Sequence, residues 1–196
     1  MKKIALVTSL VLIATANSYS DMIGAKAGYN FWKTASHGDA HNAYIRIEHS
    51  LPIVPNIGFS SIKIDNHDKF QLDTYDLFGY YEILDNGTLS LDIGAGARQL
   101  VNGQVYNQSF HDTLPMARSE VELLTDSTFS FYGNLGVGKS NSSSFIDAHF
   151  GVRFNPLIGI TLQVSYREYH LTLDDVNGTK ESECISGPMI GLHIDF

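Results

Sequence analysis

Apolar and polar residues alternate with a period of two along most of the chain. Between Thr88 and Arg98 every second residue is apolar, with Ser, Asp, Gly and Arg between them, and similar alternation recurs in 129–137, 146–154 and 158–167. Because successive side chains of a strand point to opposite faces, the pattern predicts strands with one apolar and one polar face. No comparable stretch has the period of about 3.6 residues typical of a helix, so we expect an all-β chain.

This pattern predicts ten strands. Each has about the 9 to 11 residues that a tilted strand needs to cross the hydrocarbon of a membrane. The predicted strands are 22–32, 42–50, 56–64, 70–82, 88–99, 114–124, 128–138, 145–154, 158–171 and 186–196. Eight strands is the alternative, if the third or the sixth does not form.

The predicted connections differ in length between the two ends of the strands. Those after the second, fourth, sixth and eighth strands are tight turns, centred on 52–55, 85–87, 125–127 and 155–156. Those on the other side are generally longer and polar, including 99–113 and 172–185, although the connection at 65–69 is short. Short turns on one side and longer loops on the other are typical of outer-membrane barrels, whose short turns lie in the periplasm. An even strand number places both termini on that side.

The polar face of the strands is rich in Gly and carries charges of both signs. Inside a narrow barrel Gly leaves room and opposite charges can pair, whereas the lipid-facing surface can be apolar. A soluble β-sandwich gives the same alternation with the apolar face inward, but the mixed-charge polar set favours a closed antiparallel transmembrane β-barrel, which leaves no strand edge in lipid. The charges expected in the lumen are Lys26, Arg46, Glu48, Asp92, Arg98, Arg118, Glu120, Glu122, Asp147, Arg153 and Arg167.

Aromatic residues near the ends of the predicted strands suit the interfacial girdles of a membrane barrel. Those expected there are Tyr29, Phe31, Trp32, Tyr80, Tyr81, Phe129 and Phe154. Ordinary core positions are the alternative, because aromatic residues favour strands in any setting.

The amino terminus has the three parts of a secretory signal peptide. Lys2 and Lys3 precede an apolar run from Ile4 to Ala16, and small residues follow at 18 and 20. The run is shorter than the roughly 20 residues of a spanning helix, which disfavours a membrane anchor. We therefore expect a signal peptide at 1–20 and a single barrel domain at 21–196.

Charge and cysteine content exclude several classes of protein. Without its signal peptide the chain loses Lys2 and Lys3, so its formal charge changes from −8 to −10. An acidic surface argues against nucleic acid as a partner. Cys184 is the sole cysteine, so no intrachain disulfide can form. No motif indicates a cofactor.

The last ten residues, 187–196, alternate and end on Phe196. This arrangement resembles the carboxyl-terminal signal by which the barrel assembly machinery recognises outer-membrane proteins. We therefore expect Phe196 to act as an assembly signal.

Several segments carry patterns more specific than the alternation, including a Glu-His-x-x-Pro-x-x-Pro-Asn motif and a Tyr-Tyr-Glu-Ile-Leu-Asp-Asn motif. These segments are 27–32, 48–57, 72–86, 166–169, 173–176 and 187–188. They resemble a family of proteobacterial outer-membrane β-barrel proteins with no established activity, and the resemblance covers essentially the whole mature chain. The resemblance implies location and architecture, and it supplies no catalytic residues.

The predicted outer loops place His beside acidic residues. The groups are His37 with Asp39 and His41, His67 with Asp65 and Asp68, and His111 with Asp112. A His oriented by a carboxylate can act as a general base, which suggests a rim hydrolase of the kind found in omptins, the ten-stranded outer-membrane proteases. Solvated loops are rich in the same residues, and no omptin motif is present, so we expect no catalytic site.

Metal binding by the same loops is a second hypothesis. His37, Asp39 and His41 alternate, so an extended strand would turn all three toward one side. The segment 174–178 superficially resembles a calcium loop, but it lacks the spaced ligands of an EF-hand and is better interpreted as a turn. Neither pattern is strong enough to assign a metal ligand.

The predicted function is a structural or surface-interaction role for a monomer embedded in outer-membrane lipid. A barrel of about ten strands can be filled by its own side chains, and we expect ion pairs among Arg98, Arg118, Glu120, Glu122 and Arg153. The alternative is a narrow channel for small solutes through the Gly-rich lumen.

Overall fold

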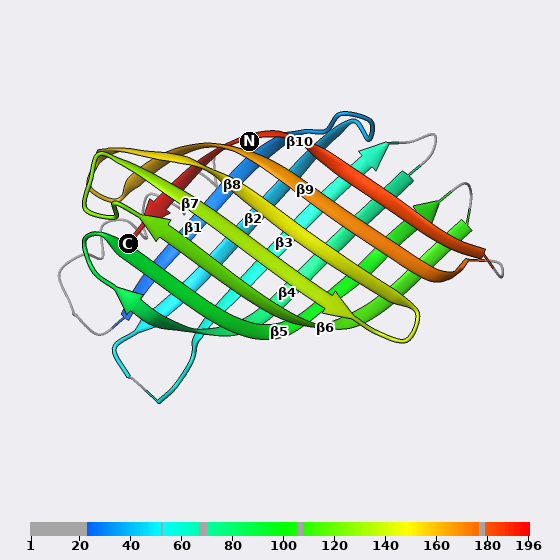
Figure 1. Cartoon of the computed structure of the whole chain (residues 1–196), viewed down its shortest axis with the longest axis horizontal. Coiled ribbons are helices and arrows are strands. Elements are labelled where there is room, and N and C mark those ends of the chain that lie inside the picture. Colours follow the sequence, from blue (N-terminus) through cyan, green and yellow to red (C-terminus); the bar gives the residue numbers. More distant parts are fainter. Residues whose placement is uncertain (1–22, 52, 67–69, 106–107, 177–178) are drawn as a thin grey trace, which may run out of the picture.

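The computed structural model is a closed barrel of ten antiparallel strands (Figure 1). It describes residues 23–196 apart from 52, 67–69, 106–107 and 177–178, so the predicted signal peptide lies outside the described residues. Consecutive strands pair, and β1 pairs with β10 to close the barrel. The strands are β1 (Ile23–Lys33), β2 (Asp39–His49), β3 (Asn56–Asn66), β4 (Phe70–Asp85), β5 (Leu89–Val105), β6 (Gln108–Leu123), β7 (Phe129–Lys139), β8 (Ser143–Leu157), β9 (Ile160–Val176) and β10 (Thr179–Asp195). The predicted fold class and the count of ten strands are confirmed. Within the described part of the chain, no helix is long and apolar enough to cross a membrane.

The two ends of the barrel are named here by the strands whose connections they hold. We call the end that holds Phe196 and the connections after β2, β4, β6 and β8 the base, at the left in Figure 1. The opposite end, with the connections after the odd-numbered strands, is the rim. Phe196 continues the seam beyond β10, because its backbone N–H donates to the Ala25 carbonyl over 2.8 Å and its carbonyl accepts from the Ala25 N–H over 3.1 Å.

The prediction of long loops at the rim is wrong. Residues 99–113 and 172–185 are mostly strand, and only residues 106–107 and 177–178 separate the paired strands there. The alternation does not identify these segments as strands, because their apolar residues lie on the inward face and their outward face is polar. Lengths of connections therefore do not distinguish the two ends.

One predicted turn is also displaced. The turn after β8 lies at Ile158–Gly159 instead of 155–156. Gly159 adopts a positive φ of 76°, which only a residue without Cβ adopts readily. Pro156 has no N–H to donate, and the pairing of β8 with β9 shifts register between Phe154 and Leu157 to accommodate it.

The outer surface has an apolar zone near the base and a polar zone near the rim. On β9 the outward residues Leu162, Val164 and Tyr166 are exposed and apolar, whereas the next outward residues are Glu168, His170 and Thr172. We call the apolar zone the belt; it includes Ile23, Tyr29, Ile45, Ile57, Phe59, Leu77, Ile93, Val121, Leu135, Phe150, Val164 and Ile190. We call the polar zone the collar; it includes Lys33, Asp39, His41, Lys63, Gln99, His111, Lys139, Glu168, His170, Thr172, Ser182 and Cys184.

The inner surface shows the opposite order. On β9 the inward residues near the base are polar, ending with Arg167, and the inward residues nearer the rim are Tyr169, Leu171 and Leu173. The rim half of the barrel thus contains an apolar core, as a water-soluble protein does. We call this core the plug; its members include Trp32, Ile62, Ile64, Phe70, Leu72, Leu100, Leu114, Phe145, Tyr169, Leu171, Ile185 and Met189.

Two of the aromatic residues expected in the interfacial girdles lie inside the barrel. Trp32 and Tyr80 are 0% and 2% exposed, because they share the inward face of β1 and β4 with Asn30 and Phe78. Tyr29, Tyr81 and Phe129 are exposed on the outer surface, and Phe31 and Phe154 are half-buried at outward positions.

Candidate functional site

The base half of the lumen contains an open cavity. Its volume is about 640 Å³, and its wall includes base turns as well as inward strand residues. Both signs of charge line it, with Lys26, Arg46 and Arg153 facing a larger number of acidic groups. The acidic lining residues are Asp85, Asp92, Glu120, Glu122, Asp126 and Asp195. This cavity is a polar vestibule that is reached from the base.

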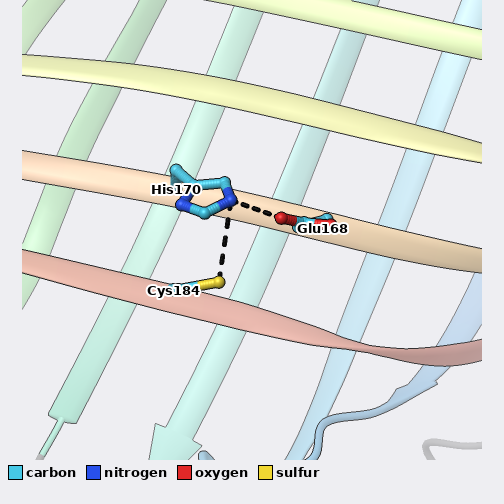
Figure 2. A group of neighbouring side chains, drawn as sticks. All are labelled: Glu168, His170 and Cys184. Carbon is cyan, nitrogen blue, oxygen red and sulfur yellow. Dashed lines mark hydrogen bonds and ion pairs between the residues drawn. The ribbon is translucent and has the colours of Figure 1, made fainter.

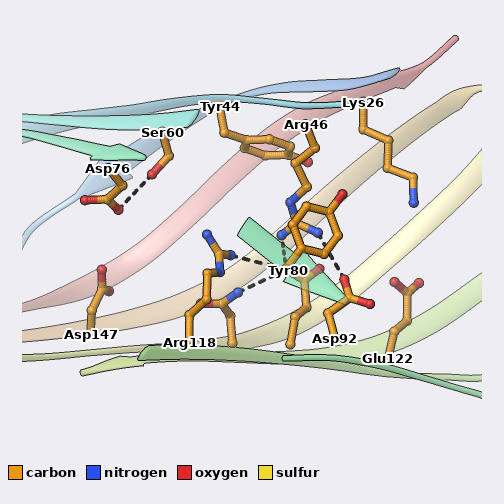
Figure 3. Close-up of polar contacts among 12 residues, drawn as sticks. Lys26, Tyr44, Arg46, Ser60, Asp76, Tyr80, Asp92, Arg118, Glu122 and Asp147 are labelled. Carbon is orange, nitrogen blue, oxygen red and sulfur yellow. Dashed lines mark hydrogen bonds and ion pairs between the residues drawn. The ribbon is translucent and has the colours of Figure 1, made fainter. Parts of the chain in front are cut away.

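Glu120 is the centre of the ion-pair network at the inner end of the vestibule. Figure 3 labels Arg46, Asp92 and Arg118 among the residues of this network. Its carboxylate accepts from Arg46, and it accepts from Arg153 Nη2 over 2.8 Å. Arg118 Nη2 lies 3.7 Å away, and Asn134 donates to the same carboxylate over 3.0 Å. One buried carboxylate is therefore shared by three guanidinium groups from different strands.

The remaining predicted lumen charges extend this network toward the base. Arg46 also reaches Asp92 over 3.4 Å, and Arg153 also pairs with Glu122. Lys26 pairs with Glu48 over 2.9 Å, and the Tyr80 hydroxyl donates to Glu48 over 2.9 Å. Tyr80 links this second pair to the network, because the Arg46 guanidinium lies 5.5 Å from the centroid of its ring.

A second charged layer closes the lumen above Glu120. The Arg98 guanidinium binds Asp76 in bidentate fashion, with both bonds 2.7 Å long, and donates to Asp147 over 2.9 Å. Arg167 makes a bidentate pair with Asp147, with bonds of 2.9 and 2.7 Å. Each side chain is at most 6% exposed. The cavity that reaches this layer has a volume of only about 50 Å³.

Asp76 was not among the charges predicted in the lumen. The inward face of β4 is largely apolar around it, so polarity did not reveal which way Asp76 points. Strand pairing could have revealed its position, because Asp76 lies directly opposite Arg98 in the hairpin that turns at Asn86–Gly87.

The plug packs directly on the second charged layer. The Arg98 guanidinium lies 4.1 Å from the Phe145 ring centroid and 5.4 Å from that of Tyr169, and Arg167 lies 5.2 Å from that of Trp32. These cation–π contacts join the charges to the apolar core. On the rim side of this charged layer, the described plug side chains pack against one another as a buried cluster.

Among the described residues, the His and acid groups at the rim do not form the pairs that a rim hydrolase would need. Asp112 accepts from Ser140 and Ser142, over 2.5 and 2.9 Å, and thereby fixes the β7–β8 turn instead of orienting His111. His41 lies 2.7 Å from the Tyr29 hydroxyl. His67 and Asp68 lie outside the described residues.

His37 is held by residues other than those predicted. Its Nε2 lies 3.1 Å from Glu183, and its Nδ1 lies 2.8 Å from the Ser36 hydroxyl. Asp39 pairs instead with Lys33 over 2.7 Å. His37 thus fastens the β1–β2 turn to β10, next to the backbone bond from Ala35 to Ser186. The spacing of His37, Asp39 and His41 does not produce a metal site.

A different group of ligand-type side chains meets on the outside of the barrel. Glu168, His170 and Cys184 in the collar have their donor atoms within 4.8 Å of one another. Cys184 was identified in the sequence only as an isolated thiol, because its neighbours come from another strand.

Comparisons with known proteins bear on the fold. No family model and no curated protein sequence matches the chain. Its structure is similar to that of the outer membrane protease OmpT from Escherichia coli, with a TM-score of 0.52 and 9% sequence identity over 92% of this chain and 99% of that chain. It also matches the KdgM porin (TM-score 0.44, 10% identity, 87% and 99% covered) and the amino-terminal β-barrel domain of Pseudomonas aeruginosa OprF (TM-score 0.36, 9% identity, 88% and 97% covered). The similarity to OmpT and the closed antiparallel sheet of ten strands together show that the chain has the fold of a bacterial outer-membrane β-barrel.

Proposed function

We propose that this chain is an integral protein of the bacterial outer membrane whose barrel is closed to solutes and whose role is structural or depends on its outer surface. The observation that carries the proposal is the reversal of polarity along the strands. Near the base the barrel is apolar outside and charged inside, and near the rim it is polar outside and apolar inside.

The belt supports location in lipid. Exposed apolar patches on monomeric soluble proteins rarely exceed a few hundred Å², whereas here large apolar side chains are exposed on all ten strands. On β8 the outward positions from Ile146 to Phe154 are all apolar, over the length of about nine residues that a tilted strand needs to span hydrocarbon. In a closed barrel every strand also has a hydrogen-bonded neighbour on both sides, as a lipid environment requires.

We also propose that the base lies in the periplasm and the rim outside the cell. The strands continue past the belt only at the rim, so the collar takes the place of the longer extracellular loops of other barrels. The signal peptide at 1–20, the assembly signal at Phe196, the monomeric state and the membership of the proteobacterial family belong to this proposal. They are supported by the sequence patterns described above.

The plug favours a closed barrel over a narrow channel. An ion entering from the base would meet Glu120 and its three Arg partners, and then the paired layer of Arg98 and Asp147. Beyond that layer it would have to cross a close-packed apolar core, where an unpaired charge is strongly disfavoured. The vestibule therefore ends inside the protein.

Single-channel conductance of the refolded mature protein in planar bilayers tests this proposal. Folding is first verified by heat-dependent migration on gels, and a wide porin in the same bilayer shows that the assay detects openings. We expect the wild-type barrel to be electrically silent. Steady openings whose ion selectivity changes in Glu120→Gln would instead establish the narrow channel and overturn the closed barrel.

A further inference from the structure

Three metal-ligating side chains lie together on the outside of the β9–β10 hairpin (Figure 2). His170 Nε2 lies 2.5 Å from Glu168 Oε1 and 3.7 Å from Cys184 Sγ. All three belong to the collar. Glu168 is the outward position next to Tyr166, the last belt residue on β9, and His170 and the facing Cys184 lie one outward position further toward the rim. They are therefore reached from the water outside the barrel.

The backbone holds these side chains in a fixed relation. His170 and Cys184 are directly opposite each other in the antiparallel ladder, where facing Cβ atoms are about 4.5–5.5 Å apart. Glu168 is two residues before His170 and so lies on the same face. The pairing of β9 with β10 is regular from Glu181 to Ile194, so the three Cα positions rest on a continuous ladder.

The separations are close to those of a tetrahedral zinc site. With Zn–S of about 2.3 Å and Zn–N of about 2.0–2.1 Å, the sulfur and nitrogen ligands are about 3.6 Å apart, close to the 3.7 Å seen here. The Glu168 oxygen would have to move away from His170 by about 0.9 Å to reach the corresponding N–O separation of about 3.4 Å. That movement is open to it, because half of the Glu168 side chain is exposed.

The donor set selects the kind of ion. Calcium and magnesium prefer all-oxygen sites, whereas thiolate and imidazole favour zinc and other borderline or soft ions. Three protein ligands with a water in the fourth position is a common arrangement for zinc. An exposed site on a strand pair leaves that fourth position open to solvent.

We propose that Glu168, His170 and Cys184 form a binding site for a borderline divalent cation such as Zn²⁺, exposed to the solution around the rim. On binding, the Cys184 thiol loses its proton to solvent and the sulfur coordinates the ion. Neutral His170 coordinates through Nε2, so the ion takes the place of the contact between His170 and Glu168. The site does not depend on the proposed location in the outer membrane, because it lies on the outer surface of the folded barrel.

Cobalt binding and thiol labelling test the site on the refolded mature protein. Co²⁺ should produce the near-ultraviolet thiolate-to-cobalt charge-transfer band, and Zn²⁺ should abolish it by displacement. Zn²⁺ should also slow maleimide labelling of Cys184, which is an unambiguous readout because the sequence has no other cysteine. The apparent affinity should fall by more than about 100-fold in His170→Gln, beyond the 10–100-fold range that loss of an outer-shell partner alone produces.

Matched variants identify the ligands. Cys184→Ser should lose the charge-transfer band, and Glu168→Gln should weaken binding, while His41→Gln, a change in another collar His, should leave both signals unchanged. Equal Zn²⁺ protection in wild type and His170→Gln would mean that the thiol binds alone, and the proposal would be wrong. Absence of the cobalt band in folded wild-type protein would also overturn it.

Discussion

Asp147 shows how a single residue can hold the interior together. Its carboxylate accepts from Arg167 on the neighbouring strand β9 and from Arg98 on β5, which lies three strands away around the barrel. Both guanidinium groups also contact aromatic rings of the plug. The carboxylate therefore stabilises two buried cations and, through them, the side of the plug that faces the base.

Asp147→Asn is expected to destabilise the barrel by about 3–5 kcal/mol, because it removes the anion that two buried guanidinium groups share. Urea unfolding in detergent micelles measures this, with Trp32 as the probe. Trp32 is the sole tryptophan of the sequence and lies in the plug next to Arg167, so its fluorescence reports on this region.

Asp39→Asn is the matched control for that measurement. Asp39 pairs with Lys33 at the surface, where both side chains are about half exposed or more. Loss of such a pair should cost at most about 1 kcal/mol. Equal losses in the two variants would mean that the interior network contributes no more than a surface pair does.

At the scale of the strand, the main feature is that one strand crosses two kinds of surroundings. The outward face of β9 is apolar up to Tyr166 and polar from Glu168, and the inward face changes in the opposite sense over the same residues. The strand therefore alternates along its whole length, but toward the rim its outward face changes from apolar to polar and its inward face changes from polar to apolar.

Val164→Arg and Thr172→Arg should have very different effects. Val164 lies in the belt, where an arginine facing lipid costs up to about 2–4 kcal/mol. Thr172 lies in the collar, where an exposed arginine should change the free energy of unfolding by less than about 0.5 kcal/mol. Unfolding in liposomes compares the two variants, and a similar large loss in both would place the collar in hydrocarbon.

This reversal also explains what the sequence could and could not reveal. Strict alternation predicted the ten strands and predicted that the listed charges lie on one face of them, because a period of two does not depend on which face is buried. It did not predict the rim ends of β5, β6, β9 and β10, which lie beyond the predicted strands 88–99, 114–124, 158–171 and 186–196, because the expected outward face was no longer apolar there. Contacts across the barrel, such as Arg98 with Asp147, depend on closure and curvature, which a linear pattern does not contain.

At the scale of the whole molecule, the barrel consists of two halves of different character, stacked along its axis. The base half resembles other membrane barrels in having a polar lumen, and the rim half resembles a small soluble protein with its own apolar core. The collar could therefore remain folded in water beyond the lipid.

Epitope insertions test the proposed orientation. A short epitope after Asn141, in the β7–β8 turn at the rim, should be detected by antibody on intact cells. The same epitope after Gly87, in the β4–β5 turn at the base, should be detected only after the outer membrane is permeabilised. The reverse result would show that the barrel has the opposite orientation.

The collar also has a kinetic consequence. In the proposed orientation the rim enters the bilayer first, so Lys33, Lys63 and Glu168 must cross the hydrocarbon before they reach water on the far side. That passage creates a high barrier to spontaneous insertion, and the same barrier opposes withdrawal once the protein has arrived. Lifetime in the membrane would then be set by the slow rate of escape as well as by the free energy of the folded state.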